Sequence, residues 1–188
     1  MKIISGRFKG HTLSTPKGQG TRPTSGAARE AIFNRLAHAD WAPPLEEARV
    51  IDLFAGSGAL GLEALSRGAA FCLFVETDAR ARGAIRENVE RLGLYGVTRL
   101  HRRSATDLGP RPAGLGAPFD LVFLDPPYRK ALVVPTLASL LAGGWLTETA
   151  FAVAETAEDE AFDVEGWDLI DRRVHGAAAV HMLKRSGA

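Results

Sequence analysis

The chain has 188 residues, of which 46% are hydrophobic, with 23 lysines and arginines against 22 aspartates and glutamates. This length suits one domain with a small appendage, and no apolar run reaches the roughly 20 residues of a membrane span. The N-terminus Met1–Arg7 lacks the apolar stretch of about 7–15 residues that marks a secretion signal, so we expect a cytoplasmic protein. The single cysteine, Cys72, excludes an internal disulfide, and its apolar surroundings predict a buried, inert thiol.

Residues 1–48 predict a small N-terminal extension. Its expected elements are extended pieces at 2–4 and 12–14 around a glycine turn, and a helix that runs to about residue 38. Thr24 or Ser25 is the expected N-cap of this helix. The apolar residues on one helix face are Ala28, Ile32, Phe33 and Leu36. Pro43 and Pro44 then separate the extension from the rest of the chain.

The extension is also where the positive charge lies. Residues 1–36 hold seven lysines and arginines and one glutamate, a net charge of +6, which leaves −5 for residues 37–188. Such a segment is typical of a surface that binds RNA or DNA, because each phosphate contact releases condensed counterions. A solvated arm would have the same composition, so charge alone leaves both interpretations open.

Strands and helices alternate from residue 49 to residue 188, the second predicted unit. Strands are expected at 50–54, 71–75, 97–101, 120–124, 150–155, 167–173 and 179–184, and helices at 59–67, 79–92 and 131–142. The first strands are apolar throughout, as central parallel strands are when helices cover both faces. The last two strands, with a turn at Gly176, predict an antiparallel hairpin. The expected fold class is α/β: a mostly parallel, doubly wound, Rossmann-like sheet of seven strands.

A glycine-rich loop follows the first of these strands. Gly56, Gly58 and Gly61 have the spacing G-x-G-x-x-G, which lets the backbone approach a ligand closely at the start of a helix. The same spacing fits a dinucleotide cofactor or an ordinary strand-to-helix turn.

Polar residues at three strand ends favour S-adenosylmethionine as the ligand. Asp52 would repel a pyrophosphate but accept the ammonium of a methionine moiety, directly or through water. Glu76 follows the second strand, where an acid can bind both ribose hydroxyls, and Asp78 is the competing candidate but a better helix N-cap. Backbone groups of Ser104 and Ala105 would contact the adenine. The remaining predicted cofactor contacts adjoin these residues and are Phe54, Ala55 and Thr77.

The stretch Asp125-Pro126-Pro127-Tyr128 follows the fourth strand and predicts a site for an exocyclic amine. The Asp125 carboxylate and the Pro126 carbonyl can both accept hydrogen bonds from one flat NH2 group, and Tyr128 can stack on the base that carries it. Held in this way, the nitrogen lone pair would point at a sulfonium methyl group. A rigid loop that closes a strand is the alternative explanation of Asp-Pro-Pro.

These motifs together resemble the class I, Rossmann-like amino-methyltransferases, which pair a D-x-F-x-G-x-G loop with a later D-P-P-Y or D-P-P-F. The N-terminus resembles the bacterial RsmD family at Ile3–Arg7 with Gly10, Arg22–Thr24, Arg29-Glu30 and Phe33-Asn34. The resemblance covers essentially the whole chain. The resemblance implies methylation of guanine N2 in small-subunit (16S) ribosomal RNA, with Asp125–Tyr128 as the amine pocket.

RNA contacts are implied at basic and polar residues of both units. The candidates are Arg7, Lys9, Arg22, Thr24 and Arg29 in the extension, and Arg129 and Lys130 beyond Tyr128. The sequence departs from the family at Gly26-Ala27-Ala28, where a polar, charged pair is usual.

Three other functions use some of the same residues. A DNA adenine-N6 or cytosine-N4 methyltransferase would have the same amine pocket but would need more sequence-reading apparatus. A protein-glutamine methyltransferase generally has Asn before Pro-Pro, and a cofactor-binding module without activity leaves Asp125–Tyr128 unexplained. The five histidines lack metal-ligand spacing, so we expect no metal.

Overall fold

The computed structural model describes residues 1–16, 26–160 and 163–187 of the chain. The helices are α1 (Gly26–His38), α2 (Ala59–Ser66), α3 (Ala79–Leu92) and α4 (Val133–Ala142). The strands are β1 (Arg49–Leu53), β2 (Phe71–Val75), β3 (Thr98–His101), β4 (Phe119–Leu124), β5 (Leu146–Ala157), β6 (Trp167–His175) and β7 (Ala178–Arg185).

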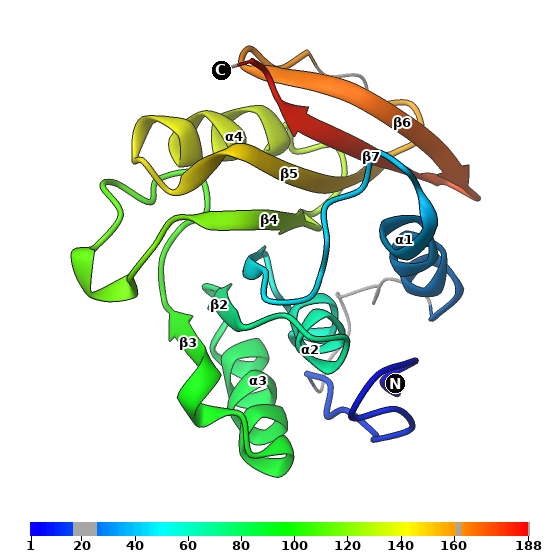
Figure 1. The fold of residues 1–188 in the computed structure, drawn as a ribbon, viewed down its shortest axis with the longest axis vertical. Helices are drawn as coiled ribbons and strands as arrows, with labels where there is room; N and C mark the ends of the chain where they lie inside the picture. The colour runs from blue at the N-terminus through cyan, green and yellow to red at the C-terminus, as the bar shows by residue number, and fades with distance from the viewer. Residues whose placement is uncertain (17–25, 161–162, 188) are drawn as a thin grey trace.

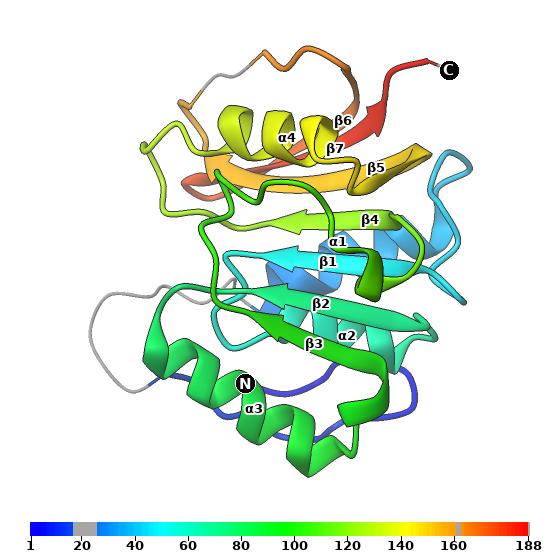
Figure 2. The ribbon, with the colours of Figure 1, turned by 90° about the vertical axis from the view of Figure 1, so that its left-hand side faces the viewer.

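The strands form one sheet in the order β3-β2-β1-β4-β5-β7-β6. The first five are parallel to one another, and Figure 2 shows them from bottom to top in this order. β7 lies antiparallel between β5 and β6, and a turn at Gly176 (φ 63°) joins it to β6. The predicted seven-stranded α/β sheet with a C-terminal hairpin is therefore confirmed.

Helices cover both faces of the sheet, as predicted (Figure 1). One hydrophobic cluster joins Phe33 of α1, Leu62 of α2 and Ile85 of α3 to one face of the sheet. A second cluster packs Leu137 of α4 and the fully buried Trp145 against the other face. Each central strand is thus buried on both sides, which explains its continuous apolar sequence.

The N-terminal segment shares the first of these clusters. Lys2 and Thr12 form an isolated antiparallel bridge, so the predicted hairpin is present but short. Ile3 and Leu13 beside this bridge are buried in the same cluster as α1 and α2. The buried face of α1 contains every apolar residue predicted for it, and also Arg29.

Most element boundaries differ from the prediction by one or two residues, and three elements show why. β1 ends at Leu53, one residue early, because Phe54 has a φ of 57°. α4 begins at Val133 instead of 131, because Ala131 has a φ of 51°, outside the helical region. β5 extends to 146–157, beyond the predicted 150–155, because β4 and β7 pair with its two ends.

Within the described ranges, no helix combines the length and apolarity that a bilayer span requires. Cys72 is buried, as predicted, and burial raises the pKa of its thiol well above the ordinary value.

Candidate functional site

The three glycines between β1 and α2 have different surroundings. Gly56 has a φ of 56°, and no atom of the described residues lies within 4 Å of where its Cβ would be. A Cβ on Gly61, in contrast, would stand 2.5 Å from the Cys72 Sγ, and one on Gly58 would lie 3.1 Å from the Phe74 ring. Gly58 and Gly61 therefore let the turn and α2 pack onto β2. Gly56 leaves a stretch of backbone open to a ligand.

Asp52, near the end of β1, is hydrogen-bonded to the glycine loop. Its carboxyl is 1% exposed, and Oδ2 accepts a hydrogen bond from the Gly61 amide at 2.9 Å. Burial raises the pKa of Asp52 well above its usual value; the Gly61 bond opposes this shift, and the negative charges of Asp125 and Glu76 add to it. Three carboxyl groups thus share one neighbourhood. The carboxylates beside Asp52 favour a cationic ligand over a pyrophosphate, and the predicted contact of Asp52 with an ammonium stays a prediction.

Glu76, directly after β2, lies against the glycine loop. Its Oε2 accepts the Gly56 amide and its Oε1 the Asp78 amide, both at 2.8 Å. Asp78 in turn accepts the Ala81 amide at 2.8 Å, which confirms it as the N-cap of α3. Each Glu76 oxygen keeps a second lone pair, so a ribose hydroxyl can still bind there. The Thr77 carbonyl accepts a hydrogen bond from the buried Arg82, which fixes this turn.

The strand register places four predicted or observed site residues in one row. Leu53 of β1 is opposite both Val75 of β2 and Leu124 of β4, and Leu124 is opposite Ala154 of β5. The residues that come next in the chain are Glu76, Phe54, Asp125 and Glu155. The left-handed backbone of Phe54 (φ 57°) is the kind of strained conformation that collects at ligand sites.

The predicted adenine contacts lie beyond β3, next to this row. His101, the last residue of β3, is opposite Val75. Three residues later Ser104 is exposed and Ala105 is buried. The Asp107 amide donates to the Ser104 carbonyl at 3.2 Å, so this segment is a turn.

The Asp125–Tyr128 loop is anchored to the end of β5. Asp125 and Tyr128 are half-buried, Pro126 is buried, Pro127 is exposed, and the Tyr128 hydroxyl donates to a Glu155 carboxylate oxygen. Glu160, just beyond β5, accepts the backbone amides of Arg129 and Ala131 at 2.8 and 3.2 Å. The loop is therefore held in one conformation, a requirement for aiming an amine. Stacking of Tyr128 on a base remains a prediction.

Asn88 of α3 links the glycine loop to the N-terminal segment. Its amide is fully buried, donates to the carbonyls of Ser57 and Ser14 at 3.0 Å, and accepts the Ser14 amide at 2.7 Å. The position of the loop thus depends on residues near the start of the chain.

The prediction that Arg29 contacts RNA disagrees with its place in the structure. Its side chain is 2% exposed, it donates to the Lys2 carbonyl at 2.5 Å, and its Nε lies 4.0 Å from the buried Glu63. Burial lowers the pKa of Arg29, and the Glu63 charge opposes that shift. Arg29 is therefore a structural cation between α1, α2 and the N-terminal segment, closed off from a polyanion.

The other predicted RNA contacts occupy separate places. Arg7 and Lys9 are exposed on a turn whose backbone meets Ser66, at the end of α2 that lies away from the glycine loop. Arg129 is exposed but pairs with Asp159 at 3.0 Å, and Lys130 is exposed beside it. Arg22 and Thr24 lie outside the described residues, as do the predicted N-cap positions of α1.

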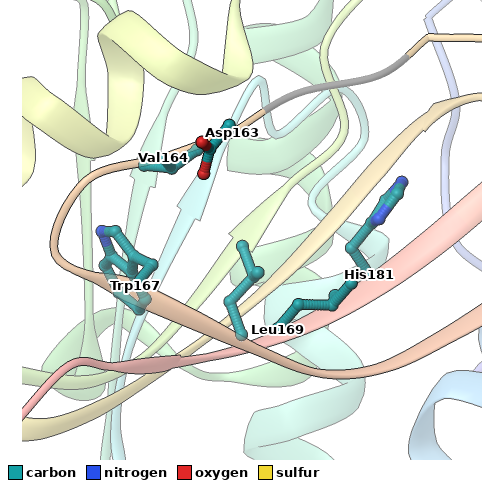
Figure 3. A pocket seen from close by; sticks show the side chains of 6 residues that line it. Asp163, Val164, Trp167, Leu169 and His181 are labelled. Atoms are coloured by element: carbon teal, nitrogen blue, oxygen red, sulfur yellow. The ribbon is translucent and has the colours of Figure 1, made fainter.

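Figure 3 shows a small pocket formed by β6, β7 and the segment that precedes β6. It is lined by Asp163, Val164, Trp167, Leu169, His181 and Leu183, none of which was predicted as a site residue. Among the described side chains, no group of three or more histidines, cysteines or acids is placed to hold a metal ion.

Three further residues that support the site were not predicted from the sequence, although each leaves a signal there. Glu63 is an acid inside an apolar helix, and Asn88 is an amide on the buried face of an amphipathic one. Glu155 ends an apolar run, as Asp125 does. All three are polar residues at positions where the pattern predicts an apolar one.

Comparison with known proteins gives matches along nearly the whole chain. The family model described as Conserved hypothetical protein 95 matches residues 1–184. The chain is 33% identical to Ribosomal RNA small subunit methyltransferase D of Escherichia coli (strain K12), over 98% of this chain and 90% of that protein. It is 34% identical to the putative rRNA methyltransferase YlbH of Bacillus subtilis (strain 168), over 100% of both.

The fold agrees with these matches. The solved structure of the putative methyltransferase yhhF from Escherichia coli has a TM-score of 0.80 and 34% identity, and the similarity covers 98% of this chain and 97% of that one. The predicted class I methyltransferase fold is confirmed. With the family model matched from residue 1 to residue 184, the chain belongs to the RsmD family of methyltransferases.

Proposed function

We propose that this protein transfers a methyl group from S-adenosylmethionine to the N2 amine of a guanine in small-subunit (16S) ribosomal RNA, in the cytoplasm, either as free RNA or in a partly assembled subunit. One observation carries the proposal. The glycine loop and the Asp125–Tyr128 loop leave adjacent parallel strands at the same level, since Leu53 and Leu124 are register partners. β1 and β4 are also the strands between which the connection order reverses, where ligands bind in such sheets.

The residues present fit S-adenosylmethionine. The open side of Gly56 leaves room for a ligand on the loop backbone, and Glu76 lies within hydrogen-bonding distance of that backbone. The acidic neighbourhood of Asp52 suits the two cationic groups of this ligand, the sulfonium and the ammonium. When bound, the cofactor supplies an electrophilic methyl group, which the amine nitrogen attacks while the carbon–sulfur bond breaks and its electrons return to sulfur.

The chain's own contribution is to hold the amine. Its lone pair is delocalised into the base, so orientation matters more than basicity. Asp125 and the Pro126 carbonyl would accept its two N–H groups, and Glu160 and Glu155 keep their loop in place. After methyl transfer the nitrogen carries a surplus proton, which passes to Asp125 or to water.

The names of the relatives and the basic N-terminal segment support an RNA substrate. We propose residues 1–48 as the RNA-docking extension of a catalytic domain at 49–188, with Arg7 and Lys9 as its exposed basic residues among those described. Because this turn lies at the far end of α2 from the glycine loop, a docked RNA would extend along α2 to reach the site.

The test offers labelled S-adenosylmethionine with free 16S rRNA, small ribosomal subunits and DNA, and identifies the modified nucleoside by mass spectrometry. We expect N2-methylguanine in rRNA; methyladenine or methylcytosine in DNA would overturn the proposal. Asp125→Ala should slow transfer by about 100-fold or more, since it removes an orienting contact at the reacting nitrogen. Cofactor affinity should change little. Asp168→Ala, an exposed acid on β6, is the control.

A further inference from the structure

A buried carboxylate near the end of β5 has one oxygen with no role in the reaction as described. Glu155 is 7% exposed, and one of its oxygens accepts the Tyr128 hydroxyl. The other oxygen, Oε2, is buried and has no hydrogen-bond partner within the described part of the chain. A carboxylate oxygen left unpaired in this way is unfavourable, and in native proteins it calls for an explanation, such as a ligand that brings the missing donor.

The strand register gives the position of Glu155 relative to the cofactor. Across β2, β1, β4 and β5 the row reads Glu76, Phe54, Asp125 and Glu155, with neighbouring strands about 4.8 Å apart. Glu76 is the proposed ribose contact and Asp125 the proposed amine contact. Glu155 lies beside Asp125, on the side away from the cofactor. In the bound base, the atoms next to the amine would lie on this side of Asp125.

Side-chain direction agrees with this placement. Val153 of β5 belongs to the cluster on the α1 face, as does Phe123 of β4. Because side chains alternate along a strand, Glu155 faces the same side as Val153. Its bond to Tyr128, three residues after Asp125, shows that it reaches the amine loop from there.

The atoms beside the amine differ among the three bases under consideration. In guanine, the N2 amine is next to an N1–H donor. In adenine, the N6 amine is next to the N1 acceptor, and in cytosine the N4 amine is next to the N3 acceptor. A carboxylate accepts a hydrogen bond from the first and repels the lone pairs of the other two.

From these observations we infer that Glu155 is the specificity residue for guanine: its Oε2 accepts the N1–H of the base whose N2 amine Asp125 holds. The inference rests on the proposed function and adds to it the reason for choosing guanine. Tyr128 has two parts in it. Its hydroxyl orients the carboxylate, and its half-buried ring is the surface on which the base would stack.

The test compares guanine with 2-aminopurine, which keeps the N2 amine but has an acceptor at N1. Once the modified guanine is mapped, 16S rRNA with either base at that position is prepared by ligation of fragments. The wild-type protein should methylate the guanine RNA about 10- to 100-fold faster at limiting RNA, the range expected for a hydrogen bond to a charged acceptor. Glu155→Gln can donate to N1, so it should lose most of this preference or reverse it.

Three variants separate base selection from a structural role. Tyr128→Phe removes the hydroxyl bond but keeps the carboxylate, so it should retain a preference for guanine. Glu155→Asp keeps the charge on a shorter side chain and should retain part of it. Glu158→Gln changes an exposed carboxylate three residues along and should leave the preference as in the wild type.

The outcomes distinguish the two proposals. If the wild-type protein methylates no guanine in rRNA, the proposed function fails. Unchanged binding of S-adenosylhomocysteine shows that Glu155→Gln is folded. If the wild-type protein methylates guanine and the folded variant keeps the wild-type ratio of methylation rates on guanine and 2-aminopurine RNA, the inference about Glu155 is wrong. If Glu155→Gln does not fold, the other two variants decide. Loss of the preference for guanine to the same extent in Tyr128→Phe and in Glu155→Asp would overturn the inference about Glu155.

Discussion

Replacing Glu63 with glutamine should destabilise the whole protein. The side chain is fully buried and accepts the amides of Ile4 and Ser5 at 2.8 and 3.0 Å and the Arg67 Nε at 2.8 Å. Arg29, whose side chain is 2% exposed, has its Nε 4.0 Å away. Glutamine removes the negative charge beside this buried cation and turns an NH2 group toward donors. Breaking a buried ion pair from one side costs about 3–5 kcal/mol.

A loss of that size is measurable, because a domain has about 5–15 kcal/mol of stability in total. With a urea m-value of about 2 kcal/mol per molar, the unfolding midpoint should fall by roughly 2 M. Glu87→Gln removes the partner of Arg91 in an exposed pair and should change stability by less than about 1 kcal/mol. The reasoning is refuted if Glu63→Gln loses less than about 1 kcal/mol and hydrogen exchange at the Ile4 and Ser5 amides stays slow.

Two further predictions concern stability. Gly61→Ala should be strongly destabilising, because its Cβ would stand 2.5 Å from the Cys72 Sγ and from the Phe74 ring. Gly83→Ala, on an open face of α3, should instead raise the free energy of unfolding by about 0.5–1 kcal/mol. Urea unfolding in which both variants changed stability in the same direction would contradict this. His181 is neutral in the fold because burial, and then the charge of Arg172, lower its pKa to about 4. The unfolded chain, with an ordinary pKa of about 6.5, then takes up a proton first as the pH falls, so the stability that neutral His181 contributes is complete above pH 6.5 and is lost toward pH 4. His181→Gln should lose less stability over this window, and parallel curves of unfolding free energy against pH would count against the assignment.

The parts of the fold that were predicted best are those decided by local sequence. β2 and α3 have the predicted limits, because an apolar run of five residues buried on both faces and an Asp78-to-Gly93 pair of helix caps are visible in the chain itself. The row of strand ends that carries Glu76 and Asp125 also follows from chain order, since parallel strands bring their carboxyl ends to one edge.

The environment of Arg29 could not be predicted from the sequence, because it depends on a contact between distant parts of the chain. A count of charges places it with Arg7 and Lys9 in one basic segment, but its environment is set by Glu63, on a helix of the other predicted unit. No local pattern records that contact. The length of β5 has the same origin, because pairing with β7, formed more than twenty residues later, decides where it ends.

The placement of Glu63 and Asn88 changes how the N-terminal basic residues must be tested. Glu63 ties Ile4 and Ser5 to α2, and Asn88 ties Ser14 to the glycine loop at the start of that helix. The N-terminal segment is thus part of the support of the cofactor loop. A substitution that loosens it would weaken cofactor binding and RNA binding together. Only a variant that changes RNA affinity at constant cofactor affinity and unfolding free energy identifies a docking residue, and exposed Arg7 and Lys9 can meet that criterion where Arg29 cannot.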